Sequence, residues 1–234
     1  MRRAEKETAG LTDVLAKLEQ AYDNVLEAFG GCLGLRNAET EGHSQRVMAF
    51  AISIGKRLSL PSNLLVVLAR ASFLHDIGKI AIPDAILYKP SALADDEKKV
   101  MRSHCEIGYN TLQRIPFLRD AADIVLAHHE FLDGTGYPRG LRGEQIPLPA
   151  RVLSVANALD AMLSDWPYRN ALPMSQVREE IWRCAGTQFD PKIVQIFLAI
   201  PENEWVELRK KTRLALPRHL RAHHLLSSYQ QQNK

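Results

Sequence analysis

Apolar residues recur at helical spacing through most of the chain, and stretches rich in glycine and proline separate the helical segments. Between Leu11 and Phe29 the apolar positions share one helical face, and Gly30 and Gly31 end the pattern. Further helices are expected at about 40–58, 62–76, 95–104, 118–129, 149–163, 175–184 and 191–200. No alternating apolar pattern of useful length indicates a strand. The predicted fold class is therefore all-α.

Two segments interrupt the helical pattern and are expected to be loops. Residues 82–93 hold two prolines and little periodicity, and Gly78 and Pro83 end the helix before them. Residues 133–149 hold four glycines and three prolines, too many for a helix or a strand. The second loop directly follows a pair of histidines, and mobile binding elements tend to lie in such positions.

Length and composition indicate one main domain. With 234 residues and 46% apolar content, the chain can bury a single core, and we divide it into a connector (1–35), a central domain (36–200) and a basic C-terminal helix and tail (201–234). No apolar run could span a bilayer, and the charged N-terminus lacks signal-peptide features, so we expect a cytoplasmic protein. Three scattered cysteines argue against a disulfide framework and are expected to be reduced.

The charge surplus is concentrated near the C-terminus. Between Arg209 and Arg221 lie six basic residues and no acidic one, although the whole chain carries only +3. Such a tail can attract RNA or an anionic membrane, but a solvated last helix explains it more simply. We therefore expect neither a membrane nor duplex nucleic acid as a partner. The apolar stripe from Leu11 to Phe29 either packs on the domain or forms a homodimer.

Histidines and carboxylates carry the chemical signal. Glu39 and His43 are four residues apart, so both can project from one helical face toward one ion or two neighbouring ions. His75 and Asp76 are adjacent, and their directions on a helix differ by about 100°. They can still reach neighbouring ions, and a carboxylate can bridge two of them.

His104 and the pair His128 and His129 complete a set too large for one ion. A lone helical histidine is more often an ordinary core or surface residue, and only the joint pattern predicts a centre of two or three ions. Imidazole mixed with carboxylate suits iron, manganese or zinc better than magnesium or calcium.

These residues stand in motifs that resemble the HD-GYP subgroup of the HD phosphohydrolase superfamily. The motifs are ETEGHSQRV (39–47), LHDIGKI (74–80), the region of His104, HHE (128–130), DGTGYP (133–138) and QFDP (188–191). HD alone is a weak signal, but HDIGK with HHE and DGxGYP at these separations is very specific. The resemblance spans about 36–197 and implies a compact helical HD-domain bundle with a GYP loop. It also implies hydrolysis of the bacterial second messenger cyclic di-GMP.

The resemblance assigns roles to individual residues. The implied ligands of two or three divalent ions, iron or manganese, are Glu39, His43, His75, Asp76, His104, His128 and His129. Asp76 and Lys79 would be catalytic, with Lys79 facing the scissile phosphate, and Tyr137 would lie near the substrate. A hydroxide held between the ions would open the cyclic diester to pGpG, and the reaction could proceed to GMP. The GYP loop would also contact a signalling protein partner.

Three positions depart from the family pattern. Asn157 stands where an aspartate usually completes the metal set, and a neutral amide is a weaker ligand. Trp166 replaces an arginine before Pro-Tyr; it could stack on a guanine or simply pack, and Arg169 could keep a phosphate contact. Phe131 replaces a common arginine.

The departures leave a second hypothesis open beside the active phosphodiesterase. Because of Asn157 and Trp166, the chain could be a degenerate domain that binds cyclic di-GMP or a protein partner with little or no turnover. A different cyclic dinucleotide is a third reading of the substrate.

Overall fold

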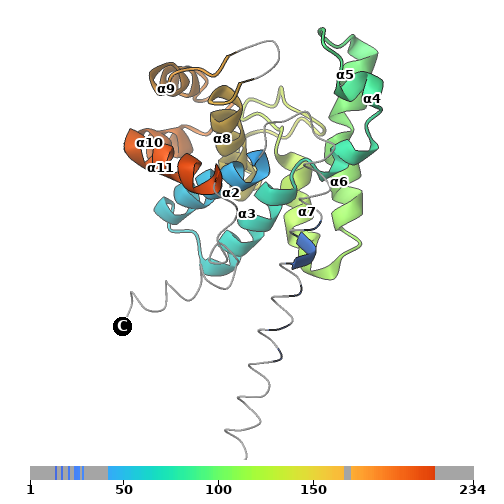
Figure 1. Cartoon of the computed structure of the whole chain (residues 1–234), viewed down its shortest axis with the longest axis horizontal. Coiled ribbons are helices and arrows are strands. Elements are labelled where there is room, and N and C mark those ends of the chain that lie inside the picture. The colour runs from blue at the N-terminus through green and yellow to red at the C-terminus, as the bar shows by residue number, and fades with distance from the viewer. Residues whose placement is uncertain are drawn as a thin grey trace, which may run out of the picture.

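The computed structural model describes residues 42–165 and 170–213, together with single positions between 14 and 28. Figure 1 shows the arrangement of its helices. The longer helices are α2 (His43–Arg57), α3 (Ser62–Leu74), α5 (Asp95–Arg102), α6 (His104–Leu112), α7 (Arg119–Ala127), α8 (Leu148–Met162), α9 (Met174–Arg183), α10 (Pro191–Ala199) and α11 (Glu202–Arg213). The short ones are α4 (Asp84–Leu87), η1 (Ile77–Ala81), η2 (Pro116–Leu118) and η3 (Gly143–Gln145).

The predicted all-α class is confirmed. Over the described ranges the structure contains helices and no strand, apart from one isolated bridge between Ala185 and Phe189. Among the helices that the structure describes, none is long and apolar enough to cross a bilayer.

Two local expectations were wrong. The predicted loop at 82–93 contains the one-turn helix α4, which begins after Pro83 with Asp84 in its first turn, where an acidic side chain interacts favourably with the helix dipole. The single helix expected through 95–104 is two helices, α5 and α6. They are separated at Ser103, whose hydroxyl donates to the carbonyl of Val100 at 2.6 Å.

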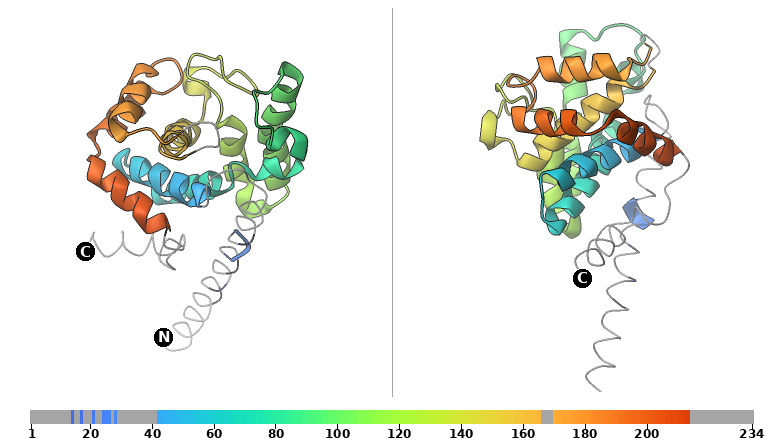
Figure 2. Two further views of the ribbon diagram at one scale, coloured as in Figure 1. Left: turned by 45° about the horizontal axis from the view of Figure 1, so that its top comes forward. Right: turned by 90° about the vertical axis from the view of Figure 1, so that its left-hand side faces the viewer.

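The core lies between the four helices α2, α3, α7 and α8. Helix α2 packs against both α3 and α8, and α3 packs against α7. Figure 2 shows α8 nearly end-on in its left view, inside the ring formed by the other helices. Its apolar residues Val152, Leu153, Val155 and Leu159 are fully buried, as expected for a helix enclosed on several sides.

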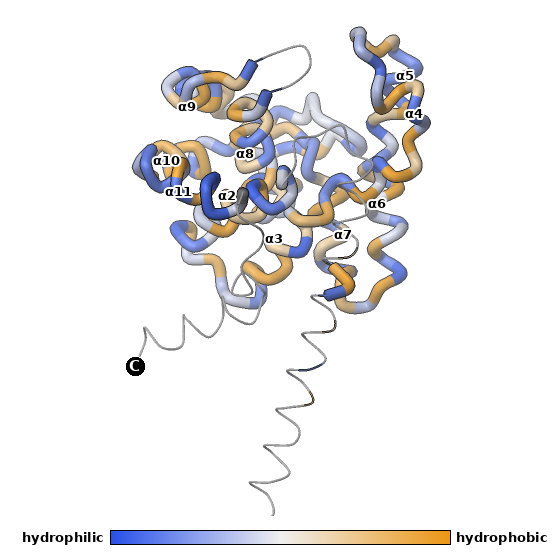
Figure 3. Tube along the Cα trace, in the orientation of Figure 1, coloured by the Kyte–Doolittle hydropathy of each residue, from blue (hydrophilic) through white to orange (hydrophobic). Residues whose placement is uncertain are grey.

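The outer helices have one apolar face each. Figure 3 shows hydrophilic and hydrophobic positions alternating along α9 and α11. In α11 the buried face holds Trp205, whose ring meets Phe50 of α2 edge-on at 5.4 Å and lies 5.5 Å from Phe197. The first part of the predicted basic C-terminal segment therefore contributes an aromatic anchor to the core.

Candidate metal centre

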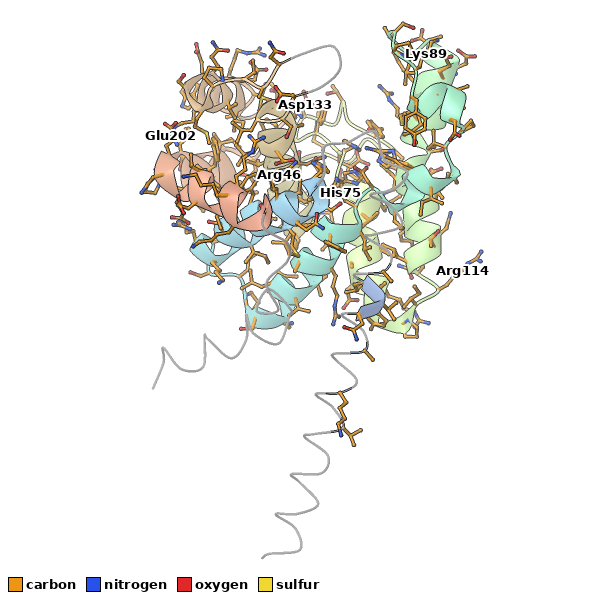
Figure 4. All side chains as sticks on the ribbon, in the orientation of Figure 1. Arg46, His75, Lys89, Arg114, Asp133 and Glu202 are labelled. Atoms are coloured by element: carbon orange, nitrogen blue, oxygen red, sulfur yellow. The ribbon has the colours of Figure 1, made fainter. Side chains whose placement is uncertain are left out.

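The histidines converge at the ends of four helices. His43 begins α2, His75 follows the last residue of α3, His104 begins α6, and His128 follows the last residue of α7. Each of the four is at least 94% buried. Figure 4 labels His75 near the middle of the molecule, close to Arg46 of α2. The core packing of these helices thus fixes where the imidazoles meet.

A close backbone contact brings the HD motif to α6. A Cβ atom on Gly78 would lie 2.0 Å from the carbonyl oxygen of His104 and 2.7 Å from the nitrogen of Gly108. Only glycine permits such an approach. Gly78 of the HDIGK motif therefore sets the distance between Asp76 and His104.

Three of the histidines are held by the same local hydrogen bond. Each Nδ1 donates to the carbonyl oxygen three residues earlier, at 2.6 to 2.8 Å. The pairs are His75 with Ser72, His104 with Met101, and His128 with Val125. Because a carbonyl oxygen can only accept, the proton of a neutral imidazole lies on Nδ1 and the lone pair on Nε2. These side chains are therefore prepared to bind a cation through Nε2.

The fourth histidine is held by a carboxylate. His43 Nδ1 donates to Asp160 Oδ2 at 2.7 Å, and Arg46 donates to both oxygens of Asp160 at 2.6 and 3.0 Å. All three side chains are buried. Burial disfavours the charge on Asp160, but the bonds from His43 and Arg46 hold its pKa below the usual range. This carboxylate orients His43 so that Nε2 faces His75.

The Nε2 atoms face one another in two pairs. His43 and His75 have their Nε2 atoms 3.4 Å apart, and the same distance separates those of His104 and His128. Two lone pairs at this distance repel unless a cation lies between them. For an ion with nitrogen ligands at about 2.1 Å in a tetrahedron, adjacent ligands are about 3.4 Å apart. The spacing of each pair fits a bound metal ion.

Asp76 lies between the two pairs. Its Oδ2 accepts from Lys79 Nζ at 2.9 Å and lies 3.0 Å from His75 Nε2, while Oδ1 lies 3.5 Å from His104 Nε2. Oδ1 is buried without a hydrogen-bond partner. A buried, unsatisfied carboxylate oxygen facing imidazole lone pairs is what a bridging metal ligand requires.

Two ligand groups follow from these distances. Site A consists of His43, His75 and Asp76, and site B of His104, Cys105, His128 and His129; within each group the ligand atoms lie within 4.8 Å of one another. Cys105 was not among the ligands expected from the sequence. The residues of both groups fit divalent transition-metal ions.

The charge state of the centre also favours cations. Burial, as the main cause, lowers the pKa values of His104, His128 and His129, so these imidazoles are neutral near pH 7. Burial opposes the charge of Asp76, but His75 and the Lys79 ammonium more than offset it and hold the pKa of Asp76 well below its usual range. An ionised carboxylate among neutral imidazoles attracts metal ions.

We expect the metal-free protein to lose stability as the pH falls below 6.5. The three histidines of site B have folded-state pKa values below the unfolded value of about 6.5, so the unfolded state binds more protons in that window. Each contributes a slope of about 1.4 kcal/mol per pH unit. Urea unfolding with a chelator at pH 7.5, 6.5 and 5.5 measures this decline in the free energy of unfolding. The variant His128→Gln should show a shallower decline, and an unfolding free energy that stays flat for the wild type would contradict the prediction.

Asp160, which was not among the site residues expected from the sequence, holds the ligand His43 in place. Asp160→Asn should weaken metal binding about 10- to 100-fold, because it removes the carboxylate that orients His43. It should also lower stability by about 3 to 5 kcal/mol, because the Arg46 charge loses its buried partner. Metal titration and thermal unfolding measure both effects. Glu204→Gln is the control, because Glu204 pairs with Arg57 at the far end of α2; equal metal affinity in Asp160→Asn and wild type would contradict the role.

The GYP loop is tied to site B by its own backbone. Gly136 is required, because a Cβ there would lie 2.2 Å from the nitrogen of Phe131. The ring of Tyr137 stacks on His129 at 4.8 Å, and the Arg102 guanidinium lies 4.8 Å from the same ring. Tyr137 therefore lies beside His129, and its contact with the substrate stays a prediction.

Glu130 of the HHE motif closes the loop. Its buried carboxylate accepts from the backbone nitrogens of Arg139 and Leu141 at 2.8 and 2.9 Å. The glutamate is thus engaged with the loop rather than with the histidines.

The remaining predicted site residues divide into two groups. Asn157 is partly buried on α8, one turn before Asp160 and on the same face of that helix. Glu39, Trp166 and Arg169 lie outside the described residues, as do Cys32 and most of the Leu11 to Phe29 stripe.

Comparison with protein families gives a match over most of the chain. Residues 31–193 match the family model described as HD domain. Among curated proteins, a cyclic di-GMP phosphodiesterase of Thermotoga maritima is 37% identical over 86% of this chain and 55% of the relative. The cyclic di-GMP phosphodiesterase response regulator RpfG of Xanthomonas campestris is 38% identical, over 78% and 49% of the two chains. A 3'3'-cGAMP-specific phosphodiesterase of Vibrio cholerae is 32% identical, over 80% and 36%. The chain thus spans about half the length of the first two relatives, and less of the third.

A solved structure shares the fold. A cyclic GMP-AMP specific phosphodiesterase of V. cholerae superimposes with a TM-score of 0.59 at 19% identity, over 81% of this chain and 54% of the other.

Proposed function

The chain belongs to the HD domain family and to its HD-GYP subgroup, and on that premise we propose that it is a metal-dependent phosphodiesterase hydrolysing cyclic di-GMP. The supporting observation is the position of Asp76, whose two oxygens face sites A and B while Lys79 donates to Oδ2. The relatives that the chain matches are named for cyclic di-GMP or cGAMP hydrolysis. Iron or manganese, two or three ions per chain, stays our prediction for the cofactor.

The chemistry would be hydrolysis of a phosphodiester. Divalent ions held by the two sites would supply Lewis acidity and a water activated near neutral pH. Water oxygen would add to phosphorus, the bond from phosphorus to the 3'-oxygen would break, and that oxygen would take up a proton. The first cycle gives pGpG, and a second would give GMP.

Lys79 is placed to offset charge on the reacting phosphoryl group. Its ammonium is 2.9 Å from Asp76 Oδ2, and its side chain is 17% exposed, so it borders the centre without being enclosed. A cation in this position interacts more strongly with the transition state, where negative charge accumulates on the phosphoryl oxygens, than with the substrate. Tyr137 and the loop behind it would limit access of water on the other side.

The decisive experiment uses reduced protein loaded with Fe(II) or Mn(II). We expect cyclic di-GMP to be converted to pGpG, as followed by chromatography, and no conversion after chelation. A panel including 3'3'-cGAMP identifies the preferred dinucleotide. Protein that holds two ions and binds cyclic di-GMP without turnover would overturn the proposal in favour of the degenerate domain.

Asn157 is the feature that supports this second candidate, and it yields a direct prediction. Asn157→Asp should raise metal affinity and turnover on the order of tenfold, because it adds a negative charge on the face of α8 that carries Asp160, the partner of His43. Asn110→Asp on the exposed face of α6 is the matched control. Metal titration and initial rates measure the change, and equal values for the variant and wild type would exclude residue 157 as a ligand position.

Three further proposals concern partners and location. We propose that the GYP loop contacts a signalling protein and that the Leu11 to Phe29 stripe mediates homodimerisation where it does not pack on the domain. Leu26, one of its described residues, is buried against the core, whereas Val14 and Val25 are exposed. The cytoplasmic location predicted from the charged N-terminal sequence stays a prediction.

A further inference from the structure

Cys105 lies among the histidines of site B. Its side chain is fully buried, and its Sγ atom is 3.5 Å from His104 Nε2. The sulfur belongs to the same group of potential ligand atoms as His128 and His129, all within 4.8 Å of one another. The motifs described above give this cysteine no role.

The distances around Cys105 fit a tetrahedral ion. With imidazole nitrogen at about 2.1 Å and thiolate sulfur at about 2.3 Å from a metal, tetrahedral geometry places nitrogen and sulfur about 3.6 Å apart and two nitrogens about 3.4 Å apart. The structure has 3.5 Å between Cys105 Sγ and His104 Nε2, and 3.4 Å between the Nε2 atoms of His104 and His128. The sulfur is thus at ligand distance from the same point in space.

The charges around site B leave a place for an anionic ligand. Imidazoles that bind a metal through Nε2 are neutral ligands, and Glu130, the next buried carboxylate along the chain, is held by the GYP loop backbone. Asp76 faces both sites, so its single charge is shared between two dications. By the family resemblance, Asn157 also stands where an aspartate usually completes the metal set. A buried dication is costly without negative ligands, and one more anion would offset part of that charge.

We propose that Cys105 coordinates the ion of site B as a thiolate, which gives that ion three histidines and one sulfur ligand. The proposal rests on the metal centre of the proposed function. The thiolate would also supply a negative charge in a centre where Asn157 replaces the aspartate that the resemblance implies. Forming the bond from sulfur to metal displaces the thiol proton, which leaves to solvent.

The sulfur ligand has a consequence for metal choice. Thiolate favours zinc, cobalt or iron over manganese, which prefers oxygen ligands. Removing Cys105 should therefore weaken cobalt or zinc binding in site B by at least the roughly tenfold effect seen for changes in the outer shell of a metal site. Manganese affinity should change less.

Cobalt(II) provides a test that does not depend on activity. Metal-free reduced protein is titrated with Co(II), and absorption is recorded in the near ultraviolet, where a bond from thiolate to cobalt gives a charge-transfer band. The double variant Cys32→Ser with Cys184→Ser retains Cys105 as its only cysteine. We expect this variant to show the band with the wild-type intensity, and Cys105→Ser and Cys105→Ala to lose it while still binding cobalt through the histidines.

Each result is decisive. Cobalt bound without the band in the wild type would mean that the Cys105 thiol does not coordinate the ion, which overturns the proposal and leaves the proposed function intact. A band that persists in Cys105→Ser and disappears in the double variant would equally overturn it. Failure of the wild type to bind cobalt at all would remove the metal centre and with it both proposals. The wild type and the double variant remain informative if the Cys105 variants do not fold.

Discussion

Asp76→Asn should remove metal binding from both sites and reduce cyclic di-GMP hydrolysis at least about 10³-fold, equivalent to about 4 kcal/mol in the activation free energy. Asparagine has nearly the same shape as aspartate but no charge. The oxygens of the Asp76 carboxylate face imidazoles of both sites. One oxygen lies 3.0 Å from His75 Nε2, and the other lies 3.5 Å from His104 Nε2. Losing it deprives two buried cations of the charge they share.

Elemental analysis and initial rates test this prediction together. Asp123→Asn on the exposed face of α7 is the matched control and should retain wild-type metal content and activity. Circular dichroism confirms that the variant is folded. An Asp76→Asn protein that keeps two ions per chain would contradict the bridging position, whatever its rate.

Lys79→Met should lower kcat about 10²- to 10³-fold while metal content stays at the wild-type value. Removing one preorganised charge that stabilises a transition state costs about 2.7 to 4 kcal/mol. The effect should fall on kcat rather than KM, because the ammonium acts mainly where negative charge develops. Methionine retains much of the aliphatic length of lysine, so packing beside Asp76 changes little.

The control for Lys79 is another lysine with a carboxylate partner. Lys89→Met breaks the pair with Glu97 away from the centre and should leave kcat unchanged. Loss of metal from Lys79→Met would show that the lysine acts by holding Asp76 in place. Unchanged kcat would exclude it from the reaction.

Sequence reasoning was most successful where a motif and the helical period coincide. The spacing of His43, His75, His104 and His128 predicted a joint centre, and the structure brings their Nε2 atoms together. Their convergence depends on helix ends, which the periodic pattern locates poorly. Helix α3 ends at Leu74 rather than at residue 76, so His75 and Asp76 occupy its cap and the following turn. This bend allows two adjacent residues to face the same centre.

The residues that hold or accompany the metal ligands could not be predicted from the sequence, for a different reason. Asp160 is 117 positions from His43 in the sequence, and only the packing of α2 against α8 brings them together. One signal was nonetheless present: Asn157 and Asp160, like His43 and Arg46, are three residues apart on a helix and so share a face. Cys105 stands alone in the sequence, without the spacing of a cysteine metal motif, and only the fold shows that its sulfur lies 3.5 Å from His104 Nε2.

We expect two cation sites that share Asp76 to act as a single catalytic centre. A titration of reduced, metal-free protein with Mn(II) or Fe(II) tests this, with bound metal and cyclic di-GMP hydrolysis measured in the same samples. We predict that hydrolysis rises only as the second ion per chain binds. Full hydrolysis in the metal-free protein, or none with two ions bound, would contradict it.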